Sequence, residues 1–206
     1  MLSVKWRGYR QAAWVGQGLL TIAVIFAAVQ GNWWNVVTLG GFLIASLVFV
    51  IQEDRLPTLF DFLFVLAALL NAAGWVWGLF GMPGLYDEIV HAFTTFAITL
   101  AVSFLVYQRM LTIFRQHTVL YLLTIASFGI AIGALWEITE WSAGKILSTQ
   151  IIGSLNDTII DLVMDTLGAI VAAFVSLWAL QEWTNRDRNS VNQHNNLRRA
   201  NEHNRH

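Results

Sequence analysis

Apolar and polar positions alternate along this chain on the scale of whole helices rather than of single turns. Six apolar stretches, each of about 18 residues or more, are separated by short polar segments. They cover residues 11–29, 34–51, 58–80, 86–107, 118–141 and 157–180. Because about 20 apolar residues cross the roughly 30 Å of hydrocarbon in a bilayer, each stretch predicts a membrane-spanning helix. The predicted fold class is therefore all-α, a polytopic membrane bundle of six transmembrane helices.

The positions of the basic residues predict how these helices are oriented. If both termini lie on the cytoplasmic side, Lys145 is the only one of the twelve lysines and arginines that lies outside. Since cytoplasmic segments carry an excess of Lys and Arg, this distribution predicts an N-in, C-in topology. Tryptophans are expected at the two interfaces, with Trp33 and Trp141 among those near the outer one.

The chain divides into a predicted six-helix transmembrane domain, residues 1–182, and a polar tail, residues 183–206. The tail is rich in Asn, Arg and His and has almost no apolar side chains. A segment of this kind cannot bury enough apolar surface to offset the entropy cost of folding. We therefore expect a disordered cytoplasmic tail.

The composition excludes a soluble domain. Of the 206 residues, 56% are hydrophobic and 12% are charged, and the mean hydropathy is +0.57, whereas soluble domains contain about 25% charged residues. The chain has no cysteine, which excludes disulfides and thiolate metal sites. The lipid bilayer is the predicted partner, and no nucleic-acid partner is expected.

Acidic residues and one histidine interrupt three of the apolar stretches. They are Asp87, Glu88 and His91 in the fourth stretch, Glu137 and Glu140 in the fifth, and Asp157, Asp161 and Asp165 in the sixth. Spacings of three or four residues place Asp87 with His91, Glu137 with Glu140, and the three aspartates of the sixth stretch each on one face of a helix. Because successive helices run in opposite directions, all three groups are expected in the outer half of the membrane, with Asp165 the deepest.

Some of these acids have an alternative role in helix capping. Asp87 and Glu88 lie in a first helical turn, where the helix dipole favours negative charge. Asp157 follows Ser154 by three residues, which is the spacing of a capping box.

Capping does not explain the remaining five polar residues. Glu137 and Glu140 lie at a helix C-terminus, where the dipole opposes negative charge. His91, Asp161 and Asp165 lie too far inside their helices to act as caps. A charge at the bilayer centre costs about 2.5–3.5 kcal/mol, so ionisable groups within a membrane indicate a functional site.

Carboxylates with one imidazole and no sulfur form a ligand set for a hard or borderline cation. We therefore predict one or two bound divalent ions, with Mn, Fe, Zn, Mg and Ca left open as the metal, and no organic cofactor. The predicted ligands are His91, Glu137, Glu140, Asp161, Asp165 and Asp87, with Glu88, Asp157 and Thr95 as secondary candidates. Glu140 and Asp157 are also candidates for a general base.

Three functions are compatible with such a site. The first is a metal-dependent membrane enzyme that hydrolyses or oxidises a lipid or lipid-linked substrate. The second is a cation or proton-coupled transporter, favoured by the polar ridge Thr95, Thr99 and Ser103, although the inverted repeat or broken helices common in transporters are not found. The third is a non-catalytic membrane assembly subunit. The substrate and the oligomeric state stay open.

Three motifs carry a resemblance to a known family. They are Y-D-E-I-V-H at 86–91, W-E-I-T-E-W at 136–141 and N-D-T-I-I-D-L-V-M-D-T-L-G-A at 156–169. In this order they resemble the YjdF-like family of bacterial inner-membrane proteins of unknown function, over roughly the third to sixth helices. A weaker similarity is to VanZ-like membrane proteins. The resemblance implies a multi-pass protein of the bacterial inner membrane and supports the position of the site, but it implies no activity.

Overall fold

The regular structure of this protein is helical throughout the residues that are described. The computed structural model describes residues 7–51, 58–82, 84–114, 117–147 and 153–203. The elements are α1 (Arg7–Val29), α2 (Trp33–Ile51), α3 (Thr58–Trp77), the short 3-10 helix η1 (Leu79–Gly81), α4 (Tyr86–Phe114), α5 (Thr118–Leu147) and α6 (Leu155–His203). This order of elements confirms the prediction of an all-α fold with six helices.

Among the described residues, five of the six helices are long and apolar enough to cross a membrane. The five spans are Gly8–Val29, Leu59–Trp77, Tyr86–Phe104, Thr118–Ile146 and Leu155–Ala179, whereas the apolar part of α2, Trp33–Val48, is shorter. Large apolar side chains point outward on α1, α2, α5 and α6, as a lipid environment allows. A sixth crossing by α2 and the N-in, C-in topology stay predictions. Four of the basic residues used for that topology lie outside the described residues, namely Lys5, Arg55, Arg115 and Arg205.

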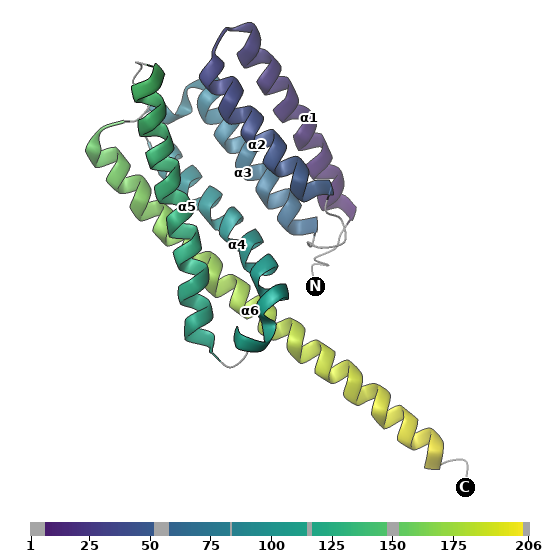
Figure 1. Ribbon diagram of the computed structural model, residues 1–206. Helices are drawn as coiled ribbons and strands as arrows, with labels where there is room; N and C mark the ends of the chain where they lie inside the picture. Colours follow the sequence, from purple (N-terminus) through teal and green to yellow (C-terminus); the bar gives the residue numbers. More distant parts are fainter. Residues whose placement is uncertain (1–6, 52–57, 83, 115–116, 148–152, 204–206) are drawn as a thin grey trace.

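The helices form two groups of three (Figure 1). In the first group, α1 packs against both α2 and α3 around small and branched apolar side chains that include Ala13, Leu20 and Val65. In the second group, α6 packs against both α4 and α5. The contact between α3 and α4 joins the two groups. Since α4, α5 and α6 carry the acidic motifs, the second group contains the predicted site.

The last two helices are longer than the sequence pattern predicts. Helix α5 continues past Trp141 to Leu147, so Lys145 lies in its last turn rather than in a loop. Its ammonium nitrogen lies 5.9 Å from the centre of the Trp141 ring, a cation–π arrangement.

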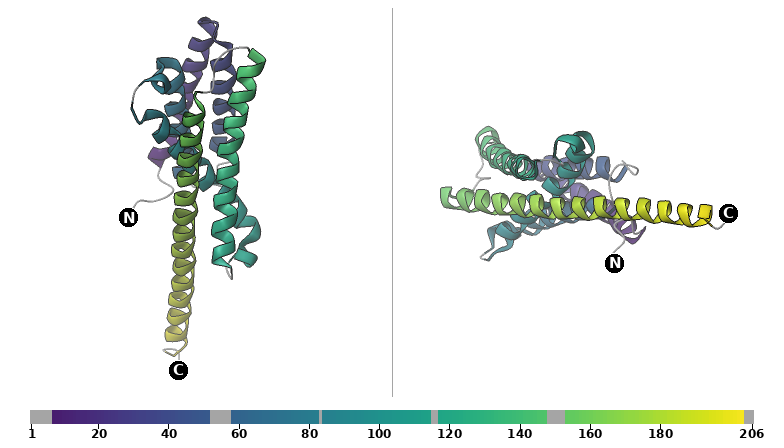
Figure 2. Two further views of the ribbon diagram at one scale, coloured as in Figure 1. Left: turned by 90° about the vertical axis from the view of Figure 1, so that its left-hand side faces the viewer. Right: turned by 90° about the horizontal axis from the view of Figure 1, so that it is seen from below.

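Helix α6 continues beyond the apolar stretch to His203, and the disordered cytoplasmic tail at residues 183–206 stays a prediction. Figures 1 and 2 show this part of the helix extending well beyond the rest of the bundle. Adding residues to an existing helix avoids the unfavourable nucleation step, and residues 183–203 contain no proline or glycine that would end the helix. Residues 204–206 lie outside the described residues.

Candidate metal centre

Small residues bring α4, α5 and α6 close together at the level of the acidic motifs. A Cβ atom added to Gly168 would overlap the backbone carbonyl of Ala92, so α6 approaches the backbone of α4 directly. A Cβ added to Gly133 of α5 would overlap the carboxylate of Asp165 in the same way. Close helix contacts in membranes depend on such small residues. Here they seat the Asp165 carboxylate in the junction of three helices.

His91 lies at the centre of this junction, and each of its ring nitrogens faces carboxylate oxygens. Its Nε2 atom is 3.5 Å from Oδ1 of Asp87, one turn earlier on α4. Its Nδ1 atom is 3.5 Å from Oδ1 of Asp165 on α6 and 3.9 Å from Oε1 of Glu137 on α5. All three helices of the second group therefore contribute to the surroundings of one imidazole.

Two groups of three residues around His91 could hold a metal ion. The first consists of Asp87, His91 and Asp161, and the second of His91, Glu137 and Asp165. Within each group, one ligand atom per residue lies within 4.8 Å of the others. Each group has two carboxylates and shares the imidazole. When the carboxylates are ionised and the imidazole is neutral, the formal charge of each group is −2, which one divalent cation balances.

The second of these groups is the more deeply buried and contains acceptor atoms without partners. Glu137 and Asp165 expose only 5% and 2% of their surface. Oε1 of Glu137 and Oδ2 of Asp165 accept no hydrogen bond, whereas Oδ1 of Asp165 accepts one from the Thr95 hydroxyl at 2.6 Å. Because an ionised carboxylate is very costly to bury without a partner, this group needs a cation or protons.

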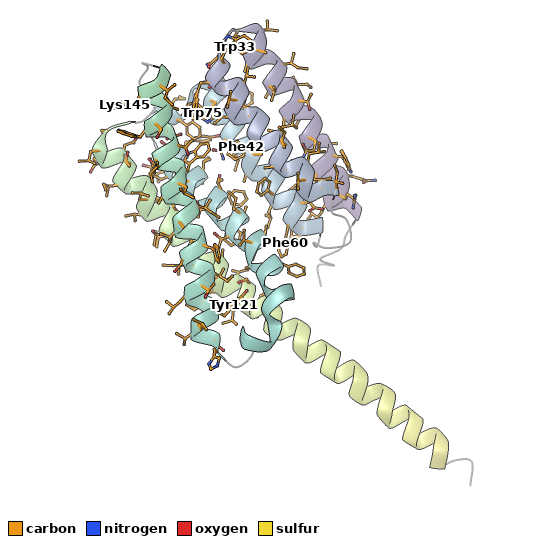
Figure 3. All side chains as sticks on the ribbon, viewed as in Figure 1. Trp33, Phe42, Phe60, Trp75, Tyr121 and Lys145 are labelled. Carbon is orange, nitrogen blue, oxygen red and sulfur yellow. The ribbon has the colours of Figure 1, made fainter. Side chains whose placement is uncertain are left out.

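A polar cavity of about 330 Å³ lies beside the two groups. Its acidic lining residues are Asp87, Glu137, Glu140, Asp157 and Asp161, and Trp75, Trp136 and Asn71 line it as well. Figure 3 shows Trp75 and Lys145 towards the same end of the bundle, with Tyr121 towards the other end. The carboxylates of three helices thus share one cavity at one end of the bundle.

The structure brings most of the predicted site residues together. They differ in whether they join His91 in a group that could hold a metal or only line the polar cavity. Asp87, Glu137, Asp161 and Asp165 join His91 in the two groups, Glu140 and Asp157 line the polar cavity without belonging to either group, and Glu88 does neither. The backbone N–H of Asp157 donates to Oγ of Ser154 at 3.2 Å, which is the hydrogen bond expected of a cap. Thr95 acts through its hydrogen bond to Asp165.

Asn71 on α3 also lines this region, although it was not among the site residues predicted from the sequence. It is buried, and its Nδ2 atom donates to Oγ1 of Thr94 on α4 at 2.8 Å and to the Ala67 carbonyl at 3.0 Å. A side-chain amide within an apolar α3 was the available signal, because membrane helices use such groups to bond to one another.

The fold and the buried polar groups define a multi-pass membrane protein with histidine and carboxylate side chains that could hold a metal ion. Residues 12–182 match the family described as "Predicted membrane protein (DUF2238)", and the chain belongs to that family. No curated protein and no solved structure matches the chain. The motifs predicted a family of bacterial inner-membrane proteins of unknown function. The match supports one part of that prediction, a membrane protein family of unknown function.

Proposed function

We propose that this protein is a metal-dependent membrane hydrolase that holds a divalent cation between His91, Glu137 and Asp165. The observation that carries the proposal is a pair of buried carboxylate oxygens without hydrogen-bond donors, Oε1 of Glu137 and Oδ2 of Asp165. Oε1 of Glu137 lies 3.9 Å from Nδ1 of His91, and the other oxygen of Asp165, Oδ1, lies 3.5 Å from the same nitrogen. A divalent ion would satisfy both oxygens and balance the two negative charges at once. The nitrogen and oxygen ligands suit Mn, Fe or Zn better than a soft cation such as Cu(I).

Asp87 supports the choice of this group over the one that contains Asp161. A histidine bound to a metal usually donates its other ring N–H to a carboxylate, which fixes the tautomer and orients the ring. With the metal on Nδ1, the other ring nitrogen of His91 is Nε2, and Asp87 lies 3.5 Å from it. Asp87 therefore takes the role of the orienting carboxylate, and Asp161 remains on the cavity wall.

The chemistry proposed for this centre is hydrolysis. A divalent ion held there would lower the pKa of a bound water towards neutrality and would so supply a hydroxide nucleophile near neutral pH. Glu140, which follows Glu137 by one turn on α5, is the favoured general base, and Asp157 is the alternative. The water oxygen would bond to the ester carbon or phosphorus of the substrate while the base accepts a proton from that water. The bond between this carbon or phosphorus and the leaving ester oxygen would break, and the base would return the proton to that oxygen.

The location of the centre supports a lipid or lipid-linked substrate. The carboxylates belong to apolar helices that are long enough to span a bilayer, so a substrate dissolved in the bilayer reaches them without leaving it. In the proposed arrangement of six crossings with N-in, C-in topology, the polar cavity opens on the outer face of a bacterial inner membrane.

Of the polar ridge that favoured a transporter, only Thr95 lines one of the two cavities formed by the described residues. Thr99 and Ser103 are fully or almost fully buried and line neither the polar cavity nor the larger apolar cavity. The Ser103 hydroxyl donates to the Leu100 carbonyl of its own helix at 2.7 Å. This packing favours the enzyme over the transporter.

Metal analysis of the purified protein tests the proposal. We expect stoichiometric divalent metal in the natural protein and its loss in the Glu137→Gln variant, which keeps the side-chain shape but removes the charge. Glu88→Gln is the matched control, because Glu88 lies on α4 outside both groups and the polar cavity, and it should keep the metal. Metal-free natural protein that hydrolyses a long-chain ester or phosphate ester would contradict the proposal.

A transport assay separates the two metal-based functions. The purified protein is placed in sealed vesicles with the metal found by analysis on one side and a long-chain ester in the membrane. Hydrolysis without metal flux is expected for the enzyme. Metal flux without hydrolysis would reject catalysis and establish the transporter.

A further inference from the structure

A second, larger cavity of about 460 Å³ begins at the proposed metal ligands and extends between the two helix groups. His91, Trp136 and Asn71 line both cavities, and Asp165 lines the larger one. On α2 the lining residues form a single stripe with helical spacing: Trp34, Val37, Thr38, Gly41, Phe42 and Ala45. Such spacing places all of them on one side of the helix, so one face of α2 is turned towards the second helix group.

The space exists because α2 stands apart from the second group. Among the described residues, the backbone of α2 packs closely against α1 and α3 but not against α4, α5 or α6. One aromatic contact crosses the gap, in which the ring centres of Phe42, labelled in Figure 3, and Trp136 lie 5.7 Å apart. Ile98 and Ile132 also line the cavity, so its walls are predominantly apolar.

The cavity is open towards the lipid side of the bundle. Val37 on α2 and Leu135 on α5 both line it, and they expose 68% and 62% of their surface. In a membrane, the surface around these two residues faces hydrocarbon. A chain from the surrounding bilayer can therefore enter between α2 and α5 and extend towards His91.

We infer that this cavity binds one hydrocarbon chain of an amphiphilic substrate whose polar head lies in the acidic cavity beside His91. The inference rests on the proposed function, because it assigns the class of molecule on which that centre acts. A cavity lined by acidic side chains and a predominantly apolar cavity meet at His91, Trp136 and Asn71, and an amphiphile is the class of ligand that matches both.

The dimensions fit a single chain. From Trp34 to Ala45 the stripe advances by about 16 Å at 1.5 Å per residue. One leaflet occupies about half of the roughly 30 Å hydrocarbon core, or about 15 Å, which is the depth that one lipid chain spans. The volume of about 460 Å³ also lies within the range of about 300–1,000 Å³ that is usual for small-molecule sites.

Photo-crosslinking in vesicles tests this inference. The probe is a long-chain alcohol that carries a diazirine near the end of its chain, because a neutral head avoids repulsion by the acidic cavity. We expect crosslinks at Phe42, Ile98 and Ile132, and we expect unlabelled long-chain alcohol to compete with them.

Two neighbouring glycines on α2 provide a matched pair of variants. A Cβ at Gly40 or Gly41 meets no atom within 4 Å, but only Gly41 of the two lines the cavity. Gly41→Leu should reduce the competed crosslinking about tenfold, which corresponds to about 1.4 kcal/mol, and Gly40→Leu should leave it unchanged. Ala45→Phe, which fills the cavity further along the stripe, is the second blocking variant if Gly41→Leu does not fold.

Metal analysis of the same samples separates this inference from the proposed function. The chain site would be overturned, even if metal is bound, by crosslinks that spread over exposed positions such as Ile44 and Val48. Such crosslinks would not be reduced by unlabelled alcohol or by the blocking variants. Competed crosslinking in a natural protein that binds no metal would reject the metal centre and leave the chain site in place. Glu137→Gln should lose metal and keep the crosslinks.

Discussion

Replacing Thr95 by Val is expected to weaken metal binding at the proposed centre about 10- to 100-fold. The substitution keeps the size of the side chain and removes one hydroxyl. That hydroxyl donates to Oδ1 of Asp165 at 2.6 Å, and both residues are buried. The distance lies in the range of about 2.5–2.7 Å that is typical of a hydroxyl bonded to an ionised carboxylate.

The magnitude follows from the energy of this single bond. Hydrogen bonds to charged groups contribute about 1.5–3 kcal/mol, and 1.4 kcal/mol is a tenfold change in a dissociation constant. Without the hydroxyl, the Asp165 carboxylate loses the hydrogen bond that holds it towards His91. Orienting partners of metal ligands typically account for 10- to 100-fold in affinity, which agrees with the range derived from the bond.

The assay is a competition titration with a chelator of known affinity on detergent-solubilised protein. Thr166→Val is the matched control, because the Thr166 hydroxyl donates to the Leu162 carbonyl of its own helix at 2.7 Å rather than to the Asp165 carboxylate. The control should change the affinity by no more than about a factor of three, or about 0.7 kcal/mol. Equal affinities for the Thr95→Val and natural proteins would refute the role of this hydrogen bond.

Three further predictions concern packing, protons and catalysis. Gly168→Ala should destabilise the bundle by about 1–3 kcal/mol in thermal unfolding, because the added Cβ meets the backbone of Ala92. Gly18→Ala is the control and should be neutral or stabilising, because its Cβ meets nothing within 4 Å. Equal losses of stability in both variants would contradict this prediction. Bound metal should decrease as the pH falls from about 8 to about 5, because protons compete for the same ligand atoms, and metal content independent of pH would speak against carboxylate and imidazole ligands. Glu140→Gln should keep the metal and lose most of the turnover of a long-chain ester, typically about 100- to 10,000-fold for a general base, whereas full activity would remove Glu140 from that role.

The acidic residues of the candidate site were recognisable from the sequence because they interrupt apolar stretches at positions where helix capping does not explain them. Asp161 and Asp165 stand out in an apolar stretch, and no capping role explains Glu137. What the sequence did not provide was the grouping of these residues. Glu137 and Glu140 are one turn apart, yet only Glu137 comes within reach of His91 in the groups that could hold a metal. That difference depends on how α5 is rotated against α4 and α6.

An all-helical membrane protein, and the residues that are chemically unusual in it, can be predicted from the amino-acid sequence alone. Both follow from local properties, namely the length of the apolar stretches and the cost of a charge within hydrocarbon. The position of Asn71 beside the site and the apolar cavity that α2 leaves next to His91 depend on the packing of the helices. The structure also shows α6 continuing to His203. Helix rotation and spacing depend on contacts such as Gly168 against Ala92, which join residues far apart in the chain and leave no periodic pattern in it.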